Sequence, residues 1–179
     1  YCQELLHKYL LSDKIMNISG TNLLEENNVK YSYYFSNYNH TWGWATWRRA
    51  WKNYQFEISE QDLLAFIQGA DDARFSAPEK IYWENIFRDL NRESKSVWDY
   101  QWLFSVWKLN GISVTPKLNL VSNIGFGKGA THTHDADNPF ANTAIHPIKL
   151  PLIHPSKISI NQKMDILFAK NFFGIGKVQ

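Results

Sequence analysis

Apolar residues recur along this chain with two different periods. Within residues 1–11, 78–90 and 98–109 they return every three or four positions, which predicts amphipathic helices. Residues 15–19 and 112–115 are short apolar runs bounded by turn residues, Gly or Pro, which predicts buried strands. A helix, a turn and a strand in that order are typical of an α/β sheet, so we expect an α/β fold with helices packed on a short sheet.

Three further segments have weaker patterns. Residues 30–39 are rich in Tyr and Phe, which is compatible with an irregular strand or an extended loop. Residues 44–54 carry rings at helical spacing, which predicts a helix; such a ring stripe is more often core packing than a ligand site. Residues 118–124 predict a second extended run.

Capping residues mark two more helices. Ser59 predicts the start of a helix that ends at Gly69. Residues 139–157 hold four of the six prolines and predict an extended tail on the surface. Ser159 then predicts the start of a last helix, which stops at Gly174 and docks on the core.

Composition limits the classes of protein. The 179 residues suffice for one domain with its own core, and a net charge of +2 without a dense basic run argues against a nucleic-acid binder. The 16% of aromatic residues, with eight Trp, indicate a ring-rich core or a surface that stacks on sugars or bases. The single cysteine favours a reducing compartment, and the sequence contains neither a signal peptide nor a run long enough to span a bilayer. We therefore expect a cytoplasmic protein.

The first residues indicate a longer protein. The chain begins with Tyr1 rather than Met and opens directly on helical periodicity, without a preceding capping residue. We therefore expect these residues to be the later part of a longer chain.

The most suggestive chemistry lies in residues 98–102, where Asp99 stands among two Trp rings and a Tyr. The rings exclude water and offer flat faces, and the carboxylate accepts a proton or a hydrogen bond. That combination suits the handling of a sugar hydroxyl. The alternative is an acidic residue in the first turn of a helix, where the helix dipole stabilises it by ~0.3–1 kcal/mol. These residues alone favour the alternative.

Two other positions have a geometric reason to bind a ligand. Asn22 follows the predicted strand at residues 15–19, and α/β sheets bind ligands outside the carboxyl ends of their strands. Gly43 lies between Trp42 and Trp44, where a glycine allows the backbone to approach another group closely.

Two acidic or histidine motifs could suggest a metal. His132 and His134 alternate and could offer nitrogen ligands, although a polar loop is the commoner explanation for such a pair. Asp71 and Asp72 lie in a polar turn without a nearby partner, which favours a solvated loop. The glycine loop at residues 125–129 does not match a phosphate-binding loop, because the Lys-Ser/Thr ending is absent.

Five motifs together resemble a known family. They occur in this order: Ile18-Ser19-Gly20-Thr21-Asn22, Tyr34-Phe35, Trp42-Gly43-Trp44-Ala45-Thr46-Trp47-Arg48-Arg49-Ala50-Trp51, Trp98-Asp99-Tyr100-Gln101-Trp102 and Asn119-Leu120-Val121-Ser122-Asn123-Ile124-Gly125-Phe126-Gly127. Over residues 1–134 the chain resembles the later part of bacterial sugar transferases described as hemolytic-protein-like, of the nucleotide-diphospho-sugar transferase superfamily with a GT-A fold. It is more loosely similar to the eukaryotic N-acetylglucosaminyltransferase that acts on the N-glycan core.

The resemblance implies a metal-assisted, inverting transfer of a sugar from a nucleotide-sugar donor to a hydroxyl of a saccharide acceptor. Asp99 corresponds to the general base. The residues expected to line the donor and acceptor cleft or to stack on the sugar are Asn22, Trp42, Gly43, Trp44, Trp98, Asn123, Gly125, Phe126 and Gly127. A divalent metal, Mn or Mg, would stabilise the departing diphosphate, with His132 as a late ligand.

The chain departs from the family pattern in one respect. The nucleotide-binding strands and the acidic metal motif of the family precede this stretch, and no strand-ending Asp-x-Asp is present. Residues 1–138 therefore resemble the acceptor-side half of a GT-A-like domain, and residues 139–179 form an extended Pro-rich segment and a helix packed on it. We expect this part alone to be inactive, with most metal ligands upstream. The alternative is a non-catalytic carbohydrate-binding or interaction module, and contact with a membrane surface stays open.

Overall fold

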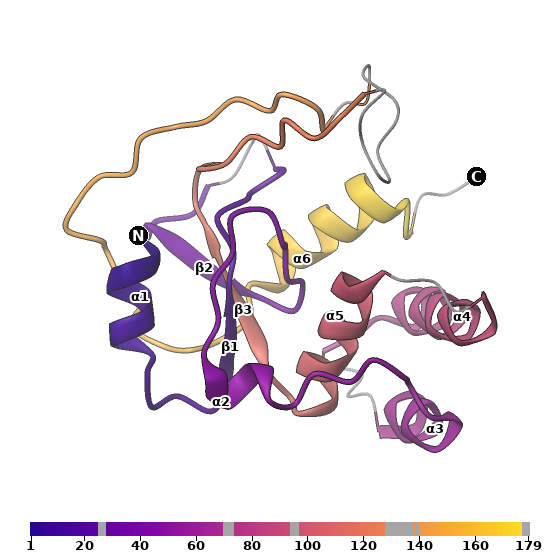
Figure 1. Ribbon diagram of the computed structural model, residues 1–179. Coiled ribbons are helices and arrows are strands. Elements are labelled where there is room, and N and C mark those ends of the chain that lie inside the picture. The colour runs from indigo at the N-terminus through magenta and orange to yellow at the C-terminus, as the bar shows by residue number, and fades with distance from the viewer. Residues whose placement is uncertain (25–27, 70–73, 94–96, 128–137, 139, 177–179) are drawn as a thin grey trace.

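The computed structural model describes the chain except residues 25–27, 70–73, 94–96, 128–137, 139 and 177–179, and the side chains of residues 91–93. The described part forms six α-helices, a π-helical turn and three strands (Figure 1). The helices are α1 (Cys2–Lys8), α2 (Arg48–Trp51), α3 (Glu60–Gly69), α4 (Ala77–Glu93), α5 (Trp98–Lys108) and α6 (Gln162–Phe168), which continues into η1 (Ala169–Phe173). The strands are β1 (Ile15–Ile18), β2 (Tyr33–Ser36) and β3 (Ile112–Pro116).

The three strands form one mixed sheet in the order β1-β3-β2. β1 is parallel to β3, and β2 is antiparallel to β3. Single bridges extend both edges, because Ala45 pairs with Ile18 of β1 and Ile160 pairs with Phe35 of β2. The fold is therefore mixed α/β with helices around a short sheet, which confirms the predicted class.

The sheet is buried on both faces by two apolar clusters. Alternate residues point to opposite faces of a strand. Tyr33 and Phe35 of β2 belong to the cluster on the side of α1, and Tyr34 belongs to the cluster formed mainly by α3 to α6. This two-sided burial explains why the Tyr- and Phe-rich residues 30–39 lack the alternation of a half-exposed strand.

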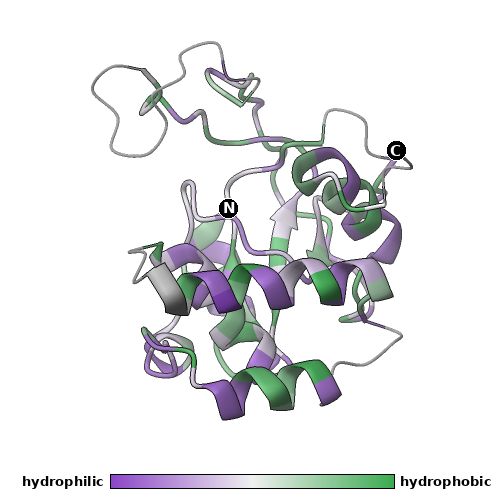
Figure 2. Ribbon diagram, turned by 90° about the vertical axis from the view of Figure 1, so that its right-hand side faces the viewer, coloured by the Kyte–Doolittle hydropathy of each residue, from purple (hydrophilic) through white to green (hydrophobic). Residues whose placement is uncertain are grey.

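The helices with the clearest periodicity form as predicted. α4 and α5 cover the predicted residues 78–90 and nearly all of 98–109. In Figure 2, α4 and the lower helix α3 both show hydrophobic and hydrophilic segments along their length. The backbone amide of Asp62 donates to the Ser59 hydroxyl at 3.1 Å, which confirms the predicted cap of α3. None of the described helices combines the length and apolarity needed to cross a membrane.

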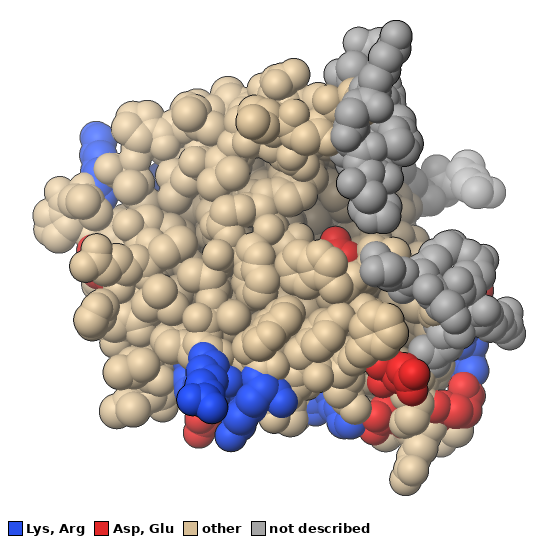
Figure 3. All heavy atoms as spheres, viewed as in Figure 1, with Lys and Arg blue, Asp and Glu red and all other residues tan. Residues whose placement is uncertain are grey.

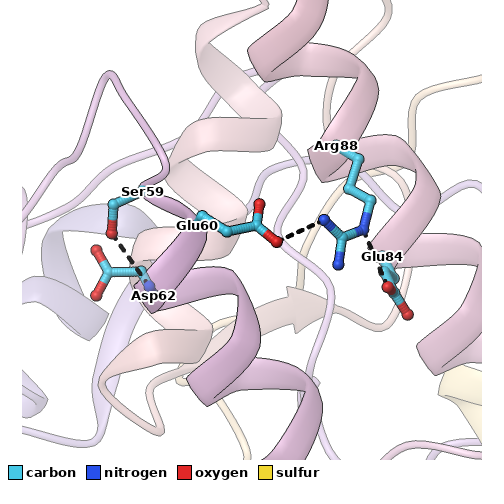
Figure 4. Close-up of polar contacts among 5 residues, drawn as sticks. All are labelled: Ser59, Glu60, Asp62, Glu84 and Arg88. Atoms are coloured by element: carbon cyan, nitrogen blue, oxygen red, sulfur yellow. Dashed lines mark hydrogen bonds and ion pairs between the residues drawn. The ribbon is translucent and has the colours of Figure 1, made fainter.

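Exposed charges join α3 to α4. Arg88 of α4 pairs with Glu60 of α3 at 2.7 Å and with Glu84 on its own helix at 3.0 Å (Figure 4). Glu84 therefore serves an ion pair at the surface.

Two predicted helices are wrong in their bounds. The first helix ends at Lys8, and the helix predicted from Trp44 is only the single turn Arg48–Trp51. The second helix starts late because Ala45 exchanges both backbone hydrogen bonds with Ile18, each at 2.9 Å, so the segment around Ala45 is an edge of the sheet. The extended run predicted at residues 118–124 belongs to none of the described strands.

The last helix begins later than predicted and ends where predicted. It starts at Gln162 rather than near Ser159, because the Asn161 side chain accepts a hydrogen bond from the amide of Met164. Gly174 ends the π-helical turn with a positive φ of 72°. The left-handed conformation there favours glycine, which confirms the predicted stop.

Candidate functional site

A cavity of about 120 Å³ lies beyond the carboxyl end of β1. Its wall comes from four segments that are far apart in the sequence: the residues after β1, the loop before α2, the first turns of α5, and the C-terminal α6 with η1. The lining residues are Thr21, Leu23, Tyr38, Asn39, His40, Thr41, Trp42, Asp99, Tyr100, Leu103, Phe168, Phe172 and Phe173. Its position agrees with the general location of ligand sites in α/β sheets.

Two hydroxyls after β1 position the loop that forms one wall. The Ser19 hydroxyl accepts from the amide of His40 and donates to its carbonyl, both at 3.0 Å. The Thr21 hydroxyl donates to the carbonyl of Trp42 at 2.8 Å. The loop is therefore fixed to the strand end by side chains rather than by a regular ladder.

Two glycines allow this loop to lie close to its neighbours. Gly43 has a positive φ of 60°, and a Cβ there would overlap the side chain of Val121. A Cβ on Gly20 would overlap the carbonyl oxygen of Gly43. The close approach predicted at Gly43 therefore exists, and its partners are other parts of this chain.

α5 places Asp99 in the cavity wall. Asp99 lies in the first turn of the helix, as predicted, and its Oδ1 accepts from the amide of Tyr100 at 3.0 Å. The helix is anchored one turn later, where the indole of Trp102 donates to Asn17 Oδ1 at 3.2 Å. The amide of Asn17 in turn donates to the buried hydroxyls of Ser19 and Ser113 at 3.0 and 2.9 Å, so this network is satisfied.

The cavity contains polar groups that the sequence did not single out. The side-chain nitrogen of Asn39 is buried and has no hydrogen-bond partner among the described residues. Burial lowers the pKa of His40 to about 4, so its imidazole is neutral at pH 7; its ring lies edge-on to Phe168 at 4.6 Å between centroids. Burial raises the pKa of Tyr100 to about 12, with smaller contributions from Tyr82 and Asp99, and this phenol keeps its proton.

An aromatic cluster next to the cavity is formed by residues of two segments that also line it, the loop before α2 and the start of α5, together with α2 itself. Trp44 packs against Trp98 and Trp51, with centroids 5.5 and 5.6 Å apart, and against Trp102 at 6.1 Å. Trp42 and Asp99 line the cavity, whereas their near neighbours Trp44 and Trp98 belong to this cluster.

The remaining predicted residues are placed as follows. Asn22 lies in a separate groove, where its side-chain amide donates to the carbonyls of Pro116 and Lys117 at 2.8 and 3.0 Å and joins the ends of β1 and β3. Phe126 meets the edge of Trp42 with centroids 5.8 Å apart.

The rest of the glycine loop forms a local turn. Asn123 accepts from the amide of Gly125 at 2.8 Å, and Gly127 has a positive φ of 111°. His132, the predicted metal ligand, lies outside the described residues, as do Asp71 and Asp72.

The acidic, histidine and cysteine side chains of the described residues form no site for the implied metal. Within them, no group of three or more His, Cys, Asp or Glu side chains is arranged to hold an ion. Carboxylate oxygens are the usual protein ligands of Mn and Mg, so the described part does not by itself fit a resident metal.

Comparison of the chain with protein-family models, with curated proteins and with solved structures found no match.

Proposed function

We propose that this chain is the acceptor-side part of a glycosyltransferase of GT-A type, which transfers a sugar from a nucleotide diphosphate to an acceptor hydroxyl with inversion. The observation that carries this proposal is one cavity that combines the carboxylate of Asp99, several ring faces and Asn39, whose side-chain nitrogen has no hydrogen-bond partner among the described residues. A sugar supplies a hydroxyl proton for the first, apolar C–H faces for the second and an oxygen for the third. The position beyond the carboxyl end of a parallel strand supports the same proposal.

Asp99 acts as the general base. It removes the proton of the acceptor hydroxyl as the hydroxyl oxygen attacks the anomeric carbon of the donor sugar. The new C–O bond forms on the face opposite the nucleoside diphosphate, which leaves with the electron pair of its bond to the sugar. The proton stays on Asp99 until water removes it. The surrounding rings exclude water that would otherwise compete with the acceptor.

The neighbouring polar side chains orient the acceptor. Asn39 donates a hydrogen bond to a sugar oxygen, which satisfies a buried group whose isolation costs about 1–3 kcal/mol. His40 is neutral at pH 7 and can accept or donate one hydrogen bond without adding charge. A divalent metal bound by residues outside the described part would stabilise the diphosphate, and each step above uses only protein side chains.

The test is the variant Asp99→Asn in the full-length protein. Asn has nearly the same shape as Asp but cannot act as a base, so kcat/KM should fall by about 10²–10⁴-fold. Release of nucleoside diphosphate from UDP-, GDP- and dTDP-sugars, with a mixture of oligosaccharide acceptors, measures the change. Asp13→Asn is the matched control, because Asp13 is an exposed carboxylate before β1, outside the cavity.

Two outcomes would count against this assignment. Wild-type turnover in Asp99→Asn would remove Asp99 from the chemistry. A loss of the same size in His40→Gln, with Asp99→Asn unaffected, would make His40 the base instead, because both side chains line the cavity.

A second candidate function is a non-catalytic carbohydrate-binding module. The exposed rings of Trp51 and Trp98 favour it, since a binding module needs only stacking surfaces. Saccharide binding that no nucleotide sugar alters, together with the absence of turnover in the full-length protein, would favour this function over transfer.

A further inference from the structure

The exposed part of the aromatic cluster has no role in the transfer step proposed above. Trp51 and Trp98 are 39% and 40% exposed, and their ring centroids are 6.3 Å apart with planes at 72°. Tyr54 stacks on Trp51 at 4.8 Å with an angle of 14°. We call Trp51, Tyr54 and Trp98 the tryptophan platform.

The platform is held rigidly by the protein. Trp51 rests on the buried Trp102 at 5.1 Å, and Trp98 rests on Trp44. The hydroxyl of Tyr54 donates to the side-chain oxygen of Gln101 at 2.9 Å. Rings that are already ordered lose little conformational entropy when a ligand binds, so the platform is prepared for contact.

The platform adjoins the cavity at the first turn of α5. Trp98 precedes Asp99 in the first turn of α5, and Asp99 lines the cavity. The two regions also interact electrostatically: burial raises the pKa of Tyr54, and the nearby carboxylate of Asp99 raises it further. A ligand that extends out of the cavity past Asp99 therefore meets the platform.

The size of the platform selects the kind of ligand. At about 40% exposure, each indole offers on the order of 100 Å² to a ligand. A stable protein–protein interface buries about 800 Å² on each partner, which is several times more. Two angled ring faces instead match the area of one sugar ring. Lys and Arg atoms gather over α2 in Figure 3, where exposed Arg48 and Lys52 flank Trp51 in sequence and add hydrogen-bond donors for hydroxyl groups.

We propose that the tryptophan platform binds the second sugar unit of an oligosaccharide acceptor whose terminal unit occupies the cavity of Asp99. The acceptor class is therefore an oligosaccharide rather than a single sugar. This inference rests on the proposed function for the terminal unit, but binding to the platform requires neither donor nor turnover.

Isothermal titration of the full-length protein with defined saccharides tests this. The probes are the cello-, chito- and malto-oligosaccharide series with one to four units, in the absence of any nucleotide sugar. In at least one series, affinity should rise about tenfold from one unit to two, as one added stacking contact predicts, and change little beyond. Trp51→Leu should abolish this step, whereas Trp51→Phe, which keeps a flat ring, should retain most of it.

A second variant and a control distinguish the loss of the binding surface from misfolding. Trp98→Leu changes the other exposed ring and should also abolish the step, while Leu11→Ala, at an exposed apolar residue outside the platform and the cavity lining, should leave it unchanged. Circular dichroism confirms that each variant is folded. Affinity that is independent of chain length, absence of binding in all three series, or wild-type binding by both Leu variants overturns the platform. So does a dimer in sedimentation that both Leu variants dissociate.

Asp99→Asn separates this inference from the proposed function. If the length dependence persists in that variant while turnover is lost, both hold. If neither wild type nor variant transfers a sugar but the length dependence is present, the platform stands and the proposed transfer fails.

Discussion

Two carboxylates near the cavity have opposite surroundings. Asp165 of α6 is only 4% exposed, and both its oxygens are bound by the protein: the Ser36 hydroxyl donates at 2.5 Å and the amide of Asn37 at 2.8 Å. Asp99 is partly exposed and lines the cavity. Both oxygens of Asp165 accept hydrogen bonds from buried donors, so this carboxylate links elements of the fold. Asp99 lies at a cavity, where a carboxylate can accept a proton from a ligand. Burial alone therefore does not identify the functional acid.

The joining role of Asp165 supports the cavity indirectly. Its hydrogen bonds fasten α6 to the end of β2, and Phe168 of α6 lines the cavity wall. Asp165 thus keeps the wall in place, and Asp99 faces the space that the wall encloses.

The largest expected effect on stability is that of Asp165→Ala. The change leaves the Ser36 hydroxyl and the Asn37 amide buried without this partner, so the free energy of unfolding should fall by about 3 kcal/mol. Asp99→Ala should lower it by less, because Asp99 is partly exposed and water can solvate the groups that its carboxylate contacts. Urea denaturation of both variants measures the difference. A larger loss in Asp99→Ala would reverse the roles assigned to the two residues.

The next effect is the pH dependence that Asp165 causes. Burial raises its pKa from 3.8 to about 7, and nearby Glu79 raises it too, while hydrogen bonds from Ser36 and Asn37 and the charge of Arg74 lower it. The folded protein keeps a proton that the unfolded chain releases, so the contribution of Asp165 to the free energy of unfolding should fall as the pH rises from about 4 to about 7. In urea denaturation at four pH values, the free energy of unfolding of Asp165→Asn should therefore rise relative to that of the wild type by at least about 1 kcal/mol across the window.

His40 supplies the control for that measurement, because its effect has the opposite sign. Its pKa falls from 6.5 to about 4, so the unfolded chain binds a proton that the folded protein rejects. Its contribution makes the folded state more stable as the pH rises from about 4 to 6.5. The decline caused by Asp165 should therefore be steeper in His40→Gln. A profile that Asp165→Asn leaves unchanged would contradict the buried, protonated state of Asp165.

Much of the fold could be predicted from local patterns. In α4 and α5 the apolar residues recur every three or four positions, and the helices that form agree with this spacing. The helix predicted from Trp44 was wrong because the backbone of Ala45 pairs with β1. The spacing of the rings cannot predict such a pairing between distant segments. β2 stayed ambiguous because both its faces are buried.

The candidate site was predictable only where its signal is local. The position of Asp99 in a first helical turn follows from the sequence, since the apolar period begins beside it. The positions of Asn39 and His40 in the cavity depend on contacts between distant segments. Ser19 holds the loop that contains them, and another part of the wall comes from α6, more than 120 residues later in the chain. Asp165 did leave a signal, an acid between Met164 and Ile166 in an apolar helix, which can mark a buried carboxylate with partners.

An increase in stability distinguishes the cavity most sharply from the buried network. The side-chain nitrogen of Asn39 has no partner among the described residues, so Asn39→Leu should raise the free energy of unfolding by about 1 kcal/mol in urea denaturation. The same variant should lower kcat/KM for sugar transfer, because the donor to the sugar oxygen is lost.

Asn17→Leu is the contrast for Asn39→Leu, because the Asn17 amide is fully bonded to Ser19, Ser113 and Trp102 and its removal should only destabilise. A gain in stability with a loss of activity is expected where a polar group is kept for a ligand rather than for the fold. If Asn39→Leu instead destabilised the protein as Asn17→Leu does, Asn39 would belong with Asp165 among the groups that hold the fold. The cavity would then lack the hydrogen-bond donor that selects an oxygen-rich ligand.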